Sequence, residues 1–542
     1  MASAPLPSRT DYIVVGGGTA GLVVASRLSE IPTVQILVLE AGLDKTSDPQ
    51  LQNPMARPLR HRPRLAIQNC EPSEWLSLLK RPGLNNREQN LPAGKVLGGS
   101  SAINGAAFLP PSPAGIDTWS RLGNSRWSWK DLLPYLRRSF TLTRPRGTPL
   151  SQVGLNAQAH TGSGGPIQVT YPALAEKGNH PLIQAWNKVF EENGYEFQPD
   201  LILERSTVGT RPYAATIDPE SGLRSSADNQ YRSLKENRPN LRIVTGATVD
   251  RILLSNDAVS HEVLATGVQV RLADGKLTEI KATKEVILAA GAFQTPKLLE
   301  LSGIGNKIIL ARHGITSIID NPGVGENLQN HSMYVQPVGL KPQEGTLTAG
   351  LQALAFVRTG EEADLAAKYL SPTDPEKMIC DHILRNPEEA SANLFVSTRP
   401  TNNVALLGVI HKPEVDPRFY SNPVNLELMA RHLRSLLQIA ASPTLQPFLD
   451  CSAVKVPENV EAAKALLRAS ALTTHHSCGT AAMLPHEQGG VVDQDLKVYG
   501  TKNLRVVDAS VFPLISYGNP MATVYAVAER AADLIKSAVD EK

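Results

Sequence analysis

The sequence predicts an α/β protein whose first domain has a Rossmann-like fold. Two short apolar runs, residues 12–15 and 34–39, are typical of buried strands. Between them lie a glycine-rich turn and apolar residues at helical spacing, which complete a strand–helix–strand unit of about thirty residues. The length of 542 residues suggests two to four domains, at about 150 residues each.

The composition is that of a globular protein with nearly balanced charge. The chain has 54 Lys and Arg residues and 52 Asp and Glu residues, which gives a formal net charge of +2. Such a balance gives no excess of positive charge that would favour binding to nucleic acid or to an anionic membrane surface. No apolar run reaches the roughly 18 residues that suggest a membrane-spanning helix. We therefore expect neither a nucleic-acid partner nor a membrane span.

The cysteines and the N-terminus bear on the cellular compartment. The four cysteines, Cys70, Cys380, Cys451 and Cys478, are scattered and include no CxxC pair. They indicate neither a zinc site nor a disulfide framework, and we expect no bound metal. The N-terminal residues lack the apolar core of a secretory signal. These features favour an intracellular, cytoplasmic protein.

The glycine-rich turn after residues 12–15 has the spacing of a dinucleotide-binding fingerprint. Gly16 permits the sharp turn at the end of the strand, and Gly18 lets a pyrophosphate approach the backbone. Gly21 allows the following helix to pack close to the strand. The first N–H groups of that helix and its dipole would stabilise phosphate. The flanking strands favour this interpretation over a glycine-rich loop that binds nothing.

Glu40, at the end of the second apolar run, supports the same interpretation. It lies 19 residues after Gly21, where a carboxylate can accept hydrogen bonds from ribose hydroxyls. Its charge would repel a 2′-phosphate, so NADP is disfavoured. A second segment, residues 94–105, is rich in glycine and serine. This segment could contact a second side of the phosphates or the face of a planar ring, or it could be an ordinary turn.

Later segments predict further strands and helices. Residues 241–290 contain three runs with strand character, and the middle one alternates cleanly between apolar and polar residues. Thr295 and Pro296 are typical of a helix N-cap and a first helical position. Residues 504–508 predict a strand, and a last helix is expected from about residue 520 to 539.

Two segments near the C-terminus carry residue types with evident chemistry. Residues 474–480 contain two adjacent histidines and end in a Gly-Thr pair. Asn519 and Pro520 stand at the start of the last helix, where Asn also suits an N-cap. His331, which follows an Asn-Leu-Gln-Asn run, is expected to organise a loop.

Together these segments resemble the glucose–methanol–choline (GMC) family of oxidoreductases. Four motifs occur in the same order along the chain as in the family: the first glycine turn, GKVLGGSSAIN, GAFQTPKLLELSGIG and the HxxGT…NP ending. The resemblance covers nearly the whole chain, and from about residue 413 onward it is greatest to the fungal aryl-alcohol and secondary-metabolite members. It implies a Rossmann-like FAD-binding domain and a second, α+β substrate domain built on an antiparallel sheet.

The resemblance also implies a division of the chain. Residues 8–335 would form mainly the FAD-binding domain, with insertions of the substrate domain around residues 150–225. Residues 336–470 would form mainly the substrate-binding domain. Residues 471–542 would return to the FAD domain and carry the catalytic pair.

Carried over residue by residue, the family pattern implies a set of cofactor contacts in addition to the glycine turn. Beside Gly16, Gly18 and Gly21 of the turn, the ADP half of FAD would be held by Thr19, Ala20, Glu40 and Ala41, with Val249 on the adenine side. The flavin would be lined by Asn104, Gly105, Ala106 and Ala107, and contacted through the backbone of Ala509, Pro520 and Met521. The catalytic histidine of the family falls on His476, and its partner position falls on Asn519.

The implied reaction is the oxidation of an alcohol. Neutral His476 would take the hydroxyl proton near neutral pH, and flavin N5 would accept the hydride. Asn519 can donate a hydrogen bond to the developing alkoxide but cannot take a proton, which leaves His476 as the base of the pair. Adjacent side chains diverge, so His475 is expected to pack or to cap. The substrate would be a small alcohol, aromatic or polyketide-derived, in fungal secondary metabolism, and oxygen or a quinone-like compound would accept the electrons.

Two of the chain's departures from the family pattern bear on its cofactor and its substrate pocket. Many members attach FAD covalently through a histidine just after the GGSS segment, whereas here Ala102, Ile103 and Asn104 follow it, so we expect noncovalent FAD. Residues 340–400, where the family has much of its substrate sheet and lid, look abbreviated. Two alternatives to alcohol oxidation stay open: a lyase or cyclase that keeps FAD as a structural part, and a non-catalytic remnant.

Overall fold

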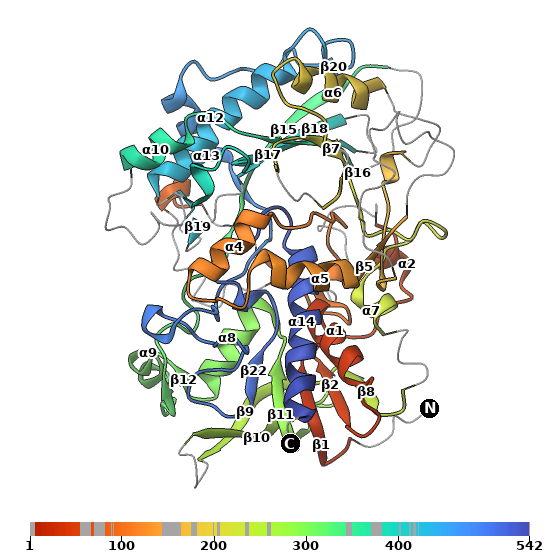
Figure 1. Ribbon diagram of the computed structural model, residues 1–542, viewed down its shortest axis with the longest axis vertical. Coiled ribbons are helices and arrows are strands. Elements are labelled where there is room, and N and C mark those ends of the chain that lie inside the picture. The colour runs from red at the N-terminus through yellow and green to blue at the C-terminus, as the bar shows by residue number, and fades with distance from the viewer. Residues whose placement is uncertain are drawn as a thin grey trace.

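The computed structural model of the chain consists of two lobes, each built around one large sheet (Figure 1). It describes residues 6–54, 67–69, 82–87, 89, 91–143, 164–174, 181–198, 200–202, 206–232, 238–256, 262–342, 350–369, 382–399, 403–410, 414–415, 419–420 and 422–540. Of the four cysteines, Cys70 and Cys380 lie outside these ranges, and Cys451 and Cys478 are free thiols.

The first lobe contains a seven-stranded mixed sheet whose parallel part carries the dinucleotide turn. The parallel strands, in spatial order, are β8 (Leu241–Thr245), β2 (Ile36–Glu40), β1 (Arg9–Val15), β11 (Leu277–Leu288) and β22 (Leu504–Val506). Two antiparallel strands, β10 (Val263–Arg271) and β9 (Thr248–Asn256), continue the sheet from the other part of β11. Every residue of β2 is buried, as expected for a parallel strand covered on both faces. The predicted α/β class is confirmed.

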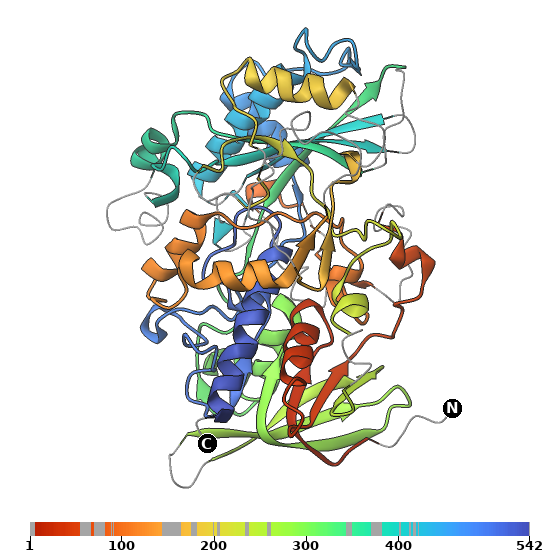
Figure 2. The ribbon, with the colours of Figure 1, turned by 45° about the vertical axis from the view of Figure 1, so that its right-hand side comes forward.

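The two ends of the chain meet in this lobe. The first helix, α1 (Thr19–Leu28), lies beside the last helix, α14 (Met521–Asp540), which also packs on α5 (Trp129–Ser139) (Figure 2). Glu529 of α14 is fully buried and accepts hydrogen bonds from Arg27 of α1 and Arg138 of α5, both at 2.9 Å from Nε. This joins the dinucleotide turn to the segment that carries the predicted catalytic pair.

The second lobe is built on an antiparallel sheet, which confirms the other half of the predicted fold class. Its strands, in spatial order, are β20 (Leu449–Asp450), β15 (Ser332–Leu340), β18 (Asn403–Ile410), β17 (Ala392–Arg399), β16 (Gly350–Val357) and β7 (Gly209–Pro212), with β21 (Leu472–Thr473) paired to β15. Strands β15, β18, β17 and β16 are each hydrogen-bonded to the next in this sheet, although the sequence of residues 340–400 looked abbreviated. The domain boundaries themselves stay a prediction.

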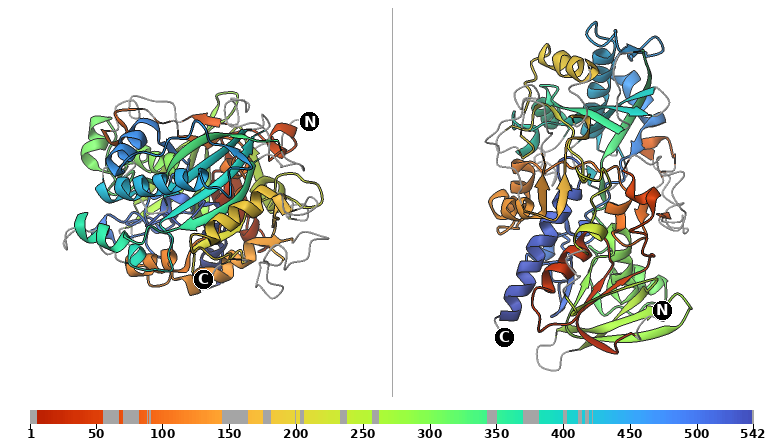
Figure 3. Two further views of the ribbon diagram at one scale, coloured as in Figure 1. Left: turned by 90° about the horizontal axis from the view of Figure 1, so that it is seen from above. Right: turned by 90° about the vertical axis from the view of Figure 1, so that its right-hand side faces the viewer.

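One face of this sheet is covered and the other faces the first lobe. Helix α12 (Pro423–Ala440) lies across the covered face (Figure 3), where Leu436 and Ala440 pack with Ala353 and Val396. On the opposite face, Phe356 clusters with residues of the first lobe's loops, among them Leu109 and Tyr517. In the described part of the chain no helix is both long and apolar enough to cross a membrane, and no cluster of three potential metal ligands occurs.

One helix begins earlier than the sequence predicts, whereas the last helix begins within one residue of the predicted position. Helix α8 (Gly291–Leu301) begins at Gly291, so Pro296 lies inside it and Thr295 is not its cap. The reason is Asp508 at the end of the β22 segment, whose Oδ2 accepts the Gly291 N–H at 2.9 Å and the Thr295 hydroxyl at 2.6 Å. Helix α14 begins at Met521, and the Pro520 carbonyl accepts its first backbone hydrogen bond.

Candidate functional site

Close backbone contacts shape the glycine turn after β1. Gly16 has a φ of +105°, and a Cβ there would lie 2.3 Å from the Ala289 carbonyl oxygen. A Cβ on Gly21 would lie 2.0 Å from the Gly16 carbonyl oxygen, so α1 packs directly on the turn. Gly18 precedes α1 without a side-chain cap, which leaves the first N–H groups of the helix able to bind an anion.

The second glycine segment lies against the first. The Gly98 N–H donates to the Gly17 carbonyl at 2.8 Å, and a Cβ on Gly99 would lie 2.8 Å from the Gly18 Cα. Gly99 begins a 3-10 helix, η4 (Gly99–Ala102), with a φ of +55°. The segment therefore forms a wall in direct contact with the dinucleotide turn, and a side chain at Gly99 would push the two apart.

Glu40 is held at the end of β2 by two backbone donors. Its Oε2 accepts the Gly17 N–H and its Oε1 accepts the Gly42 N–H, both at 2.7 Å. Burial raises the pKa of this carboxyl, and the N–H groups of Gly42 and Gly17 oppose that rise. A carboxylate oxygen has further lone pairs, so both oxygens can still accept hydrogen bonds from a ligand in the adjoining cavity.

A cavity of about 1380 Å³ runs along this wall to the histidine segment. It exceeds the roughly 300–1000 Å³ of a typical small-molecule site, so it has room for more than one such ligand. The predicted site residues that line it are Gly16, Gly18, Thr19, Ala20, Glu40, Ala41, Asn104, Gly105, Ala107, Val249, His476, Ala509, Asn519, Pro520 and Met521. Gly21 faces the turn instead, and Ala106 is buried, with a φ of +61°. Which of them bind cofactor stays a prediction.

The predicted catalytic pair is in direct contact. Asn519 Nδ2 lies 3.0 Å from His476 Nε2, and His476 Nδ1 lies 3.0 Å from His331 Nδ1. An amide nitrogen only donates, so His476 Nε2 carries the lone pair and its hydrogen is on Nδ1, which donates to His331. Because α14 begins after Asn519, the amide is turned to His476 rather than to the helix end.

Sequence reasoning missed His331 as a member of this site. It was expected to organise a loop, but its buried imidazole meets the His476 ring at 89°, with centroids 5.2 Å apart. His331 lies 145 residues before His476, between the short strand β14 (Gln329–Asn330) and β15. No spacing pattern links two residues that far apart, although the preceding Asn330 also contacts this segment by accepting the His476 N–H at 3.0 Å.

The surroundings keep the base neutral. The pKa of His476 is held well below its ordinary value, mainly because the ring is buried. The neighbouring imidazoles of His331 and His475 lower the pKa further. A neutral imidazole with its lone pair on Nε2 is ready to take a proton. Cys478, which is also buried here, has its pKa raised by burial, and this disfavours a thiolate.

The chain matches the two family models described as GMC oxidoreductase, over residues 10–333 and 399–528. The chain belongs to the GMC oxidoreductase family. One relative is the GMC oxidoreductase family protein Mala s 12 of Malassezia sympodialis, which is 31 % identical. That alignment covers 97 % of this chain and 92 % of the relative.

Solved structures agree with this assignment. An FAD-dependent oxidoreductase from Chaetomium thermophilum has a TM-score of 0.86 at 26 % identity, covering 98 % of this chain and 100 % of that one. A fungal aryl-alcohol oxidase has a TM-score of 0.82 at 28 % identity, with the same coverage. The GMC protein is thus an FAD-dependent oxidoreductase by family and by fold.

The residues present fit FAD. The start of α1 lacks a side-chain cap and faces the cavity, as a pyrophosphate site requires. The two glycine segments pack directly on each other and line the cavity, and the Glu40 carboxylate on the same wall could accept hydrogen bonds from a ribose. Asn104, held by the guanidinium of Arg224 at 2.9 Å, continues the wall toward Met521.

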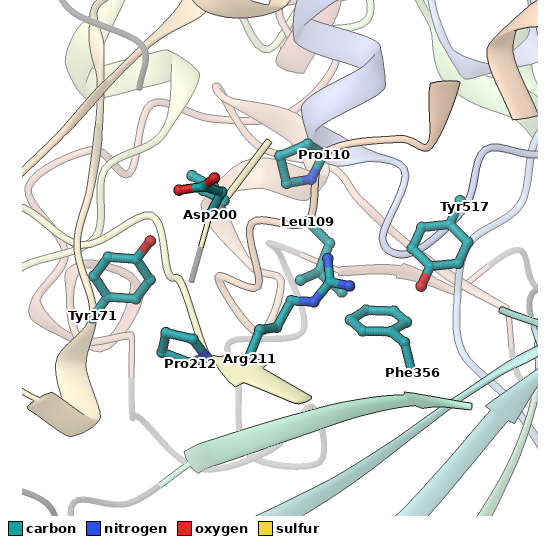
Figure 4. A pocket seen from close by; sticks show the side chains of 9 residues that line it. Leu109, Pro110, Tyr171, Asp200, Arg211, Pro212, Phe356 and Tyr517 are labelled. Carbon is teal, nitrogen blue, oxygen red and sulfur yellow. The ribbon is translucent and has the colours of Figure 1, made fainter. Parts of the chain in front are cut away.

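Behind the loop that carries Asn519 lies a second cavity, of about 10 Å³ (Figure 4). The guanidinium of Arg211, on β7, sits 4.1 Å from the centroid of the Phe356 ring, and that ring stacks on Tyr517 at 4.9 Å. Arg211 also donates to the Thr207 carbonyl. Strands of the antiparallel sheet therefore brace Tyr517, two residues before Asn519.

Proposed function

We propose that the GMC protein oxidises a small alcohol, aromatic or polyketide-derived, with His476 as the base. The observation that carries the proposal is the 3.0 Å contact between His476 Nε2 and Asn519 Nδ2 on the wall of the FAD-sized cavity. The likeness to a fungal aryl-alcohol oxidase supports an alcohol as the substrate. A role in secondary metabolism belongs to the same proposal.

The chemistry follows from the two facing atoms. A substrate hydroxyl placed beside both would give its proton to His476 Nε2 and accept a hydrogen bond from the Asn519 amide. His331 continues to accept the Nδ1 hydrogen of His476, which keeps the ring in one orientation as its charge changes. Bound FAD supplies the two-electron hydride acceptor for the carbon that loses its hydrogen.

We further propose that FAD is bound without a covalent link and that oxygen or a quinone-like compound takes up its electrons. The residues that follow the GGSS segment, Ala102 to Asn104, offer no nucleophilic side chain. The histidines on the described wall of the cavity are His475 and His476. Acid precipitation should therefore release the yellow colour into the supernatant, whereas a pellet that stays yellow would contradict noncovalent binding.

The test of the reaction is anaerobic bleaching of the purified yellow protein by benzyl alcohols. The wild type should bleach, and His476→Ala should bleach at least about 100-fold more slowly, in the range expected for loss of a general base. His486→Ala, at an exposed site away from the cavity, is the matched control and should bleach like the wild type. An unchanged rate in His476→Ala would contradict the assigned base. Product formed without bleaching would instead favour a lyase or cyclase.

A further inference from the structure

His475 is held in a conformation that few residues adopt. Its φ is +65°, in the left-handed region, which is uncommon for a residue other than glycine. Neighbouring hydrogen bonds maintain it: Thr473 Oγ1 accepts the His475 N–H at 3.1 Å, and the Thr474 hydroxyl donates to the His331 carbonyl at 3.0 Å. As a consequence the adjacent imidazoles of His475 and His476 both line the same cavity, where an extended backbone would turn them apart.

The two imidazoles differ in what they contact. His476 is bonded at both ring nitrogens, whereas the exposed His475 ring makes no hydrogen bond within the described part of the chain. The surrounding wall still desolvates the ring in part, which lowers the pKa of His475, so the ring is neutral near pH 7 and offers one donor and one acceptor. A hydrogen-bonding group fixed at a strained backbone position and directed to a cavity is typical of a ligand contact.

The part of the cavity wall formed by the histidine loop and the antiparallel sheet has no charged side chain among the described residues. Besides the histidine loop, this part includes Tyr213, Leu351, Ser397 and Thr398. The charged side chains of the described wall all belong to the first lobe and are Glu40, Lys95, Asp250, Arg271, Lys297 and Asp508. A cationic substrate calls for an acid or an aromatic cage, and an anionic one for Arg or Lys. An uncharged wall instead fits a neutral molecule.

We propose that His475 is a specificity-determining residue that hydrogen-bonds a second, uncharged polar group of the substrate. The substrate class is then a neutral aryl alcohol with a ring hydroxyl or a comparable group apart from the hydroxyl that reacts. This inference rests on the proposed function, because it assumes that the reacting hydroxyl binds beside His476 Nε2.

The binding test uses unreactive neutral probes. Dissociation constants of benzamide and of 2-, 3- and 4-hydroxybenzamide are measured from the change in flavin absorbance of the holoenzyme. The wild type should bind at least one hydroxybenzamide about 3- to 10-fold more tightly than benzamide, as one neutral hydrogen bond allows. His475→Phe keeps an aromatic ring, and His475→Gly suits the left-handed backbone, so at least one variant should fold. In each folded variant, as judged by flavin content and melting temperature, the preference should fall to within about twofold.

His486→Phe, the surface control, should keep the wild-type preference. A wild type without any preference, or variants that retain it, would overturn the role of His475. The same comparison with benzyl and hydroxybenzyl alcohols, followed as kcat/KM of bleaching, separates the two proposals. If the probes show the preference but no alcohol bleaches the flavin, the proposed oxidation fails while the contact made by His475 stands.

Discussion

Replacing Glu40 by Gln tests the nucleotide half of the site. Glu40→Gln keeps the shape of the side chain but has one acceptor oxygen where the carboxylate has two. The N–H groups of Gly17 and Gly42 each donate to one of these oxygens at 2.7 Å, so in the variant one of them faces an NH₂ group. A hydrogen bond to a charged group contributes about 1.5–3 kcal/mol, and a buried donor left without an acceptor costs about 1–3 kcal/mol.

Part of this loss is offset, because the amide avoids the cost of burying the charge that raises the pKa of Glu40. We expect a net loss of about 2 kcal/mol in the stability of the apoprotein. For a chain of 542 residues this lowers the melting temperature by about 2 °C. Loss of one hydrogen bond to a ribose hydroxyl should further raise the dissociation constant of FAD about tenfold.

The assay is titration of FAD back into apoprotein, followed by flavin fluorescence, together with thermal melting of the apoprotein. Glu279→Gln, at an exposed position of β11, removes a carboxylate of the same size from the same sheet and serves as the control. If Glu40→Gln melted and bound FAD as Glu279→Gln does, the assigned role of the carboxylate would be refuted.

Three further predictions concern the turn, the base and its partner. Because the pKa of His476 is lowered, the imidazole stays neutral below pH 6.5. The anaerobic rate of flavin bleaching should therefore be flat from pH 9 to 7 and fall only at more acidic pH, whereas a fall centred above pH 7 would contradict the assignment. Asn519→Ala should slow bleaching about 100-fold with FAD still bound, as loss of one preorganised donor does, and stopped-flow measurement checks it. Gly21→Ala places a Cβ 2.0 Å from the Gly16 carbonyl oxygen, so the flavin-to-protein ratio after purification should drop well below that of the wild type.

Local features were predictable from the sequence because neighbouring residues determine them. The turn at Gly16, the helix that follows it and the position of Glu40 depend on a unit of about thirty residues with its own steric rules. The contact between His476 and Asn519 was expected only through the family resemblance, since no local rule brings those two segments together. The structure places the two side chains in contact.

Features that depend on distant contacts were not predictable. The start of α8 is set by Asp508, which lies 213 residues after Thr295, so the local N-cap pattern at Thr295 was outweighed by a carboxylate from another strand. His331 meets His476 only because β14 and β15 pass the histidine loop. The sequence predicted that His475 packs or caps; its place on the cavity wall goes with a positive φ, which a contact between Thr474 and the distant His331 carbonyl helps to maintain.

Both lobes contribute to the placement of His476 beside Asn519. His331 directly precedes β15, β21 pairs with that strand, and Asn330 accepts the His476 N–H. Asn519 lies in the loop just before α14, and α14 packs on α1 beside the dinucleotide turn. The His476 segment is also tied to the first lobe, because the Gly479 N–H donates to the Ala509 carbonyl at 3.1 Å and the Ala481 N–H donates to the Ser510 carbonyl at 2.8 Å. The 3.0 Å contact between His476 and Asn519 is therefore maintained from both lobes.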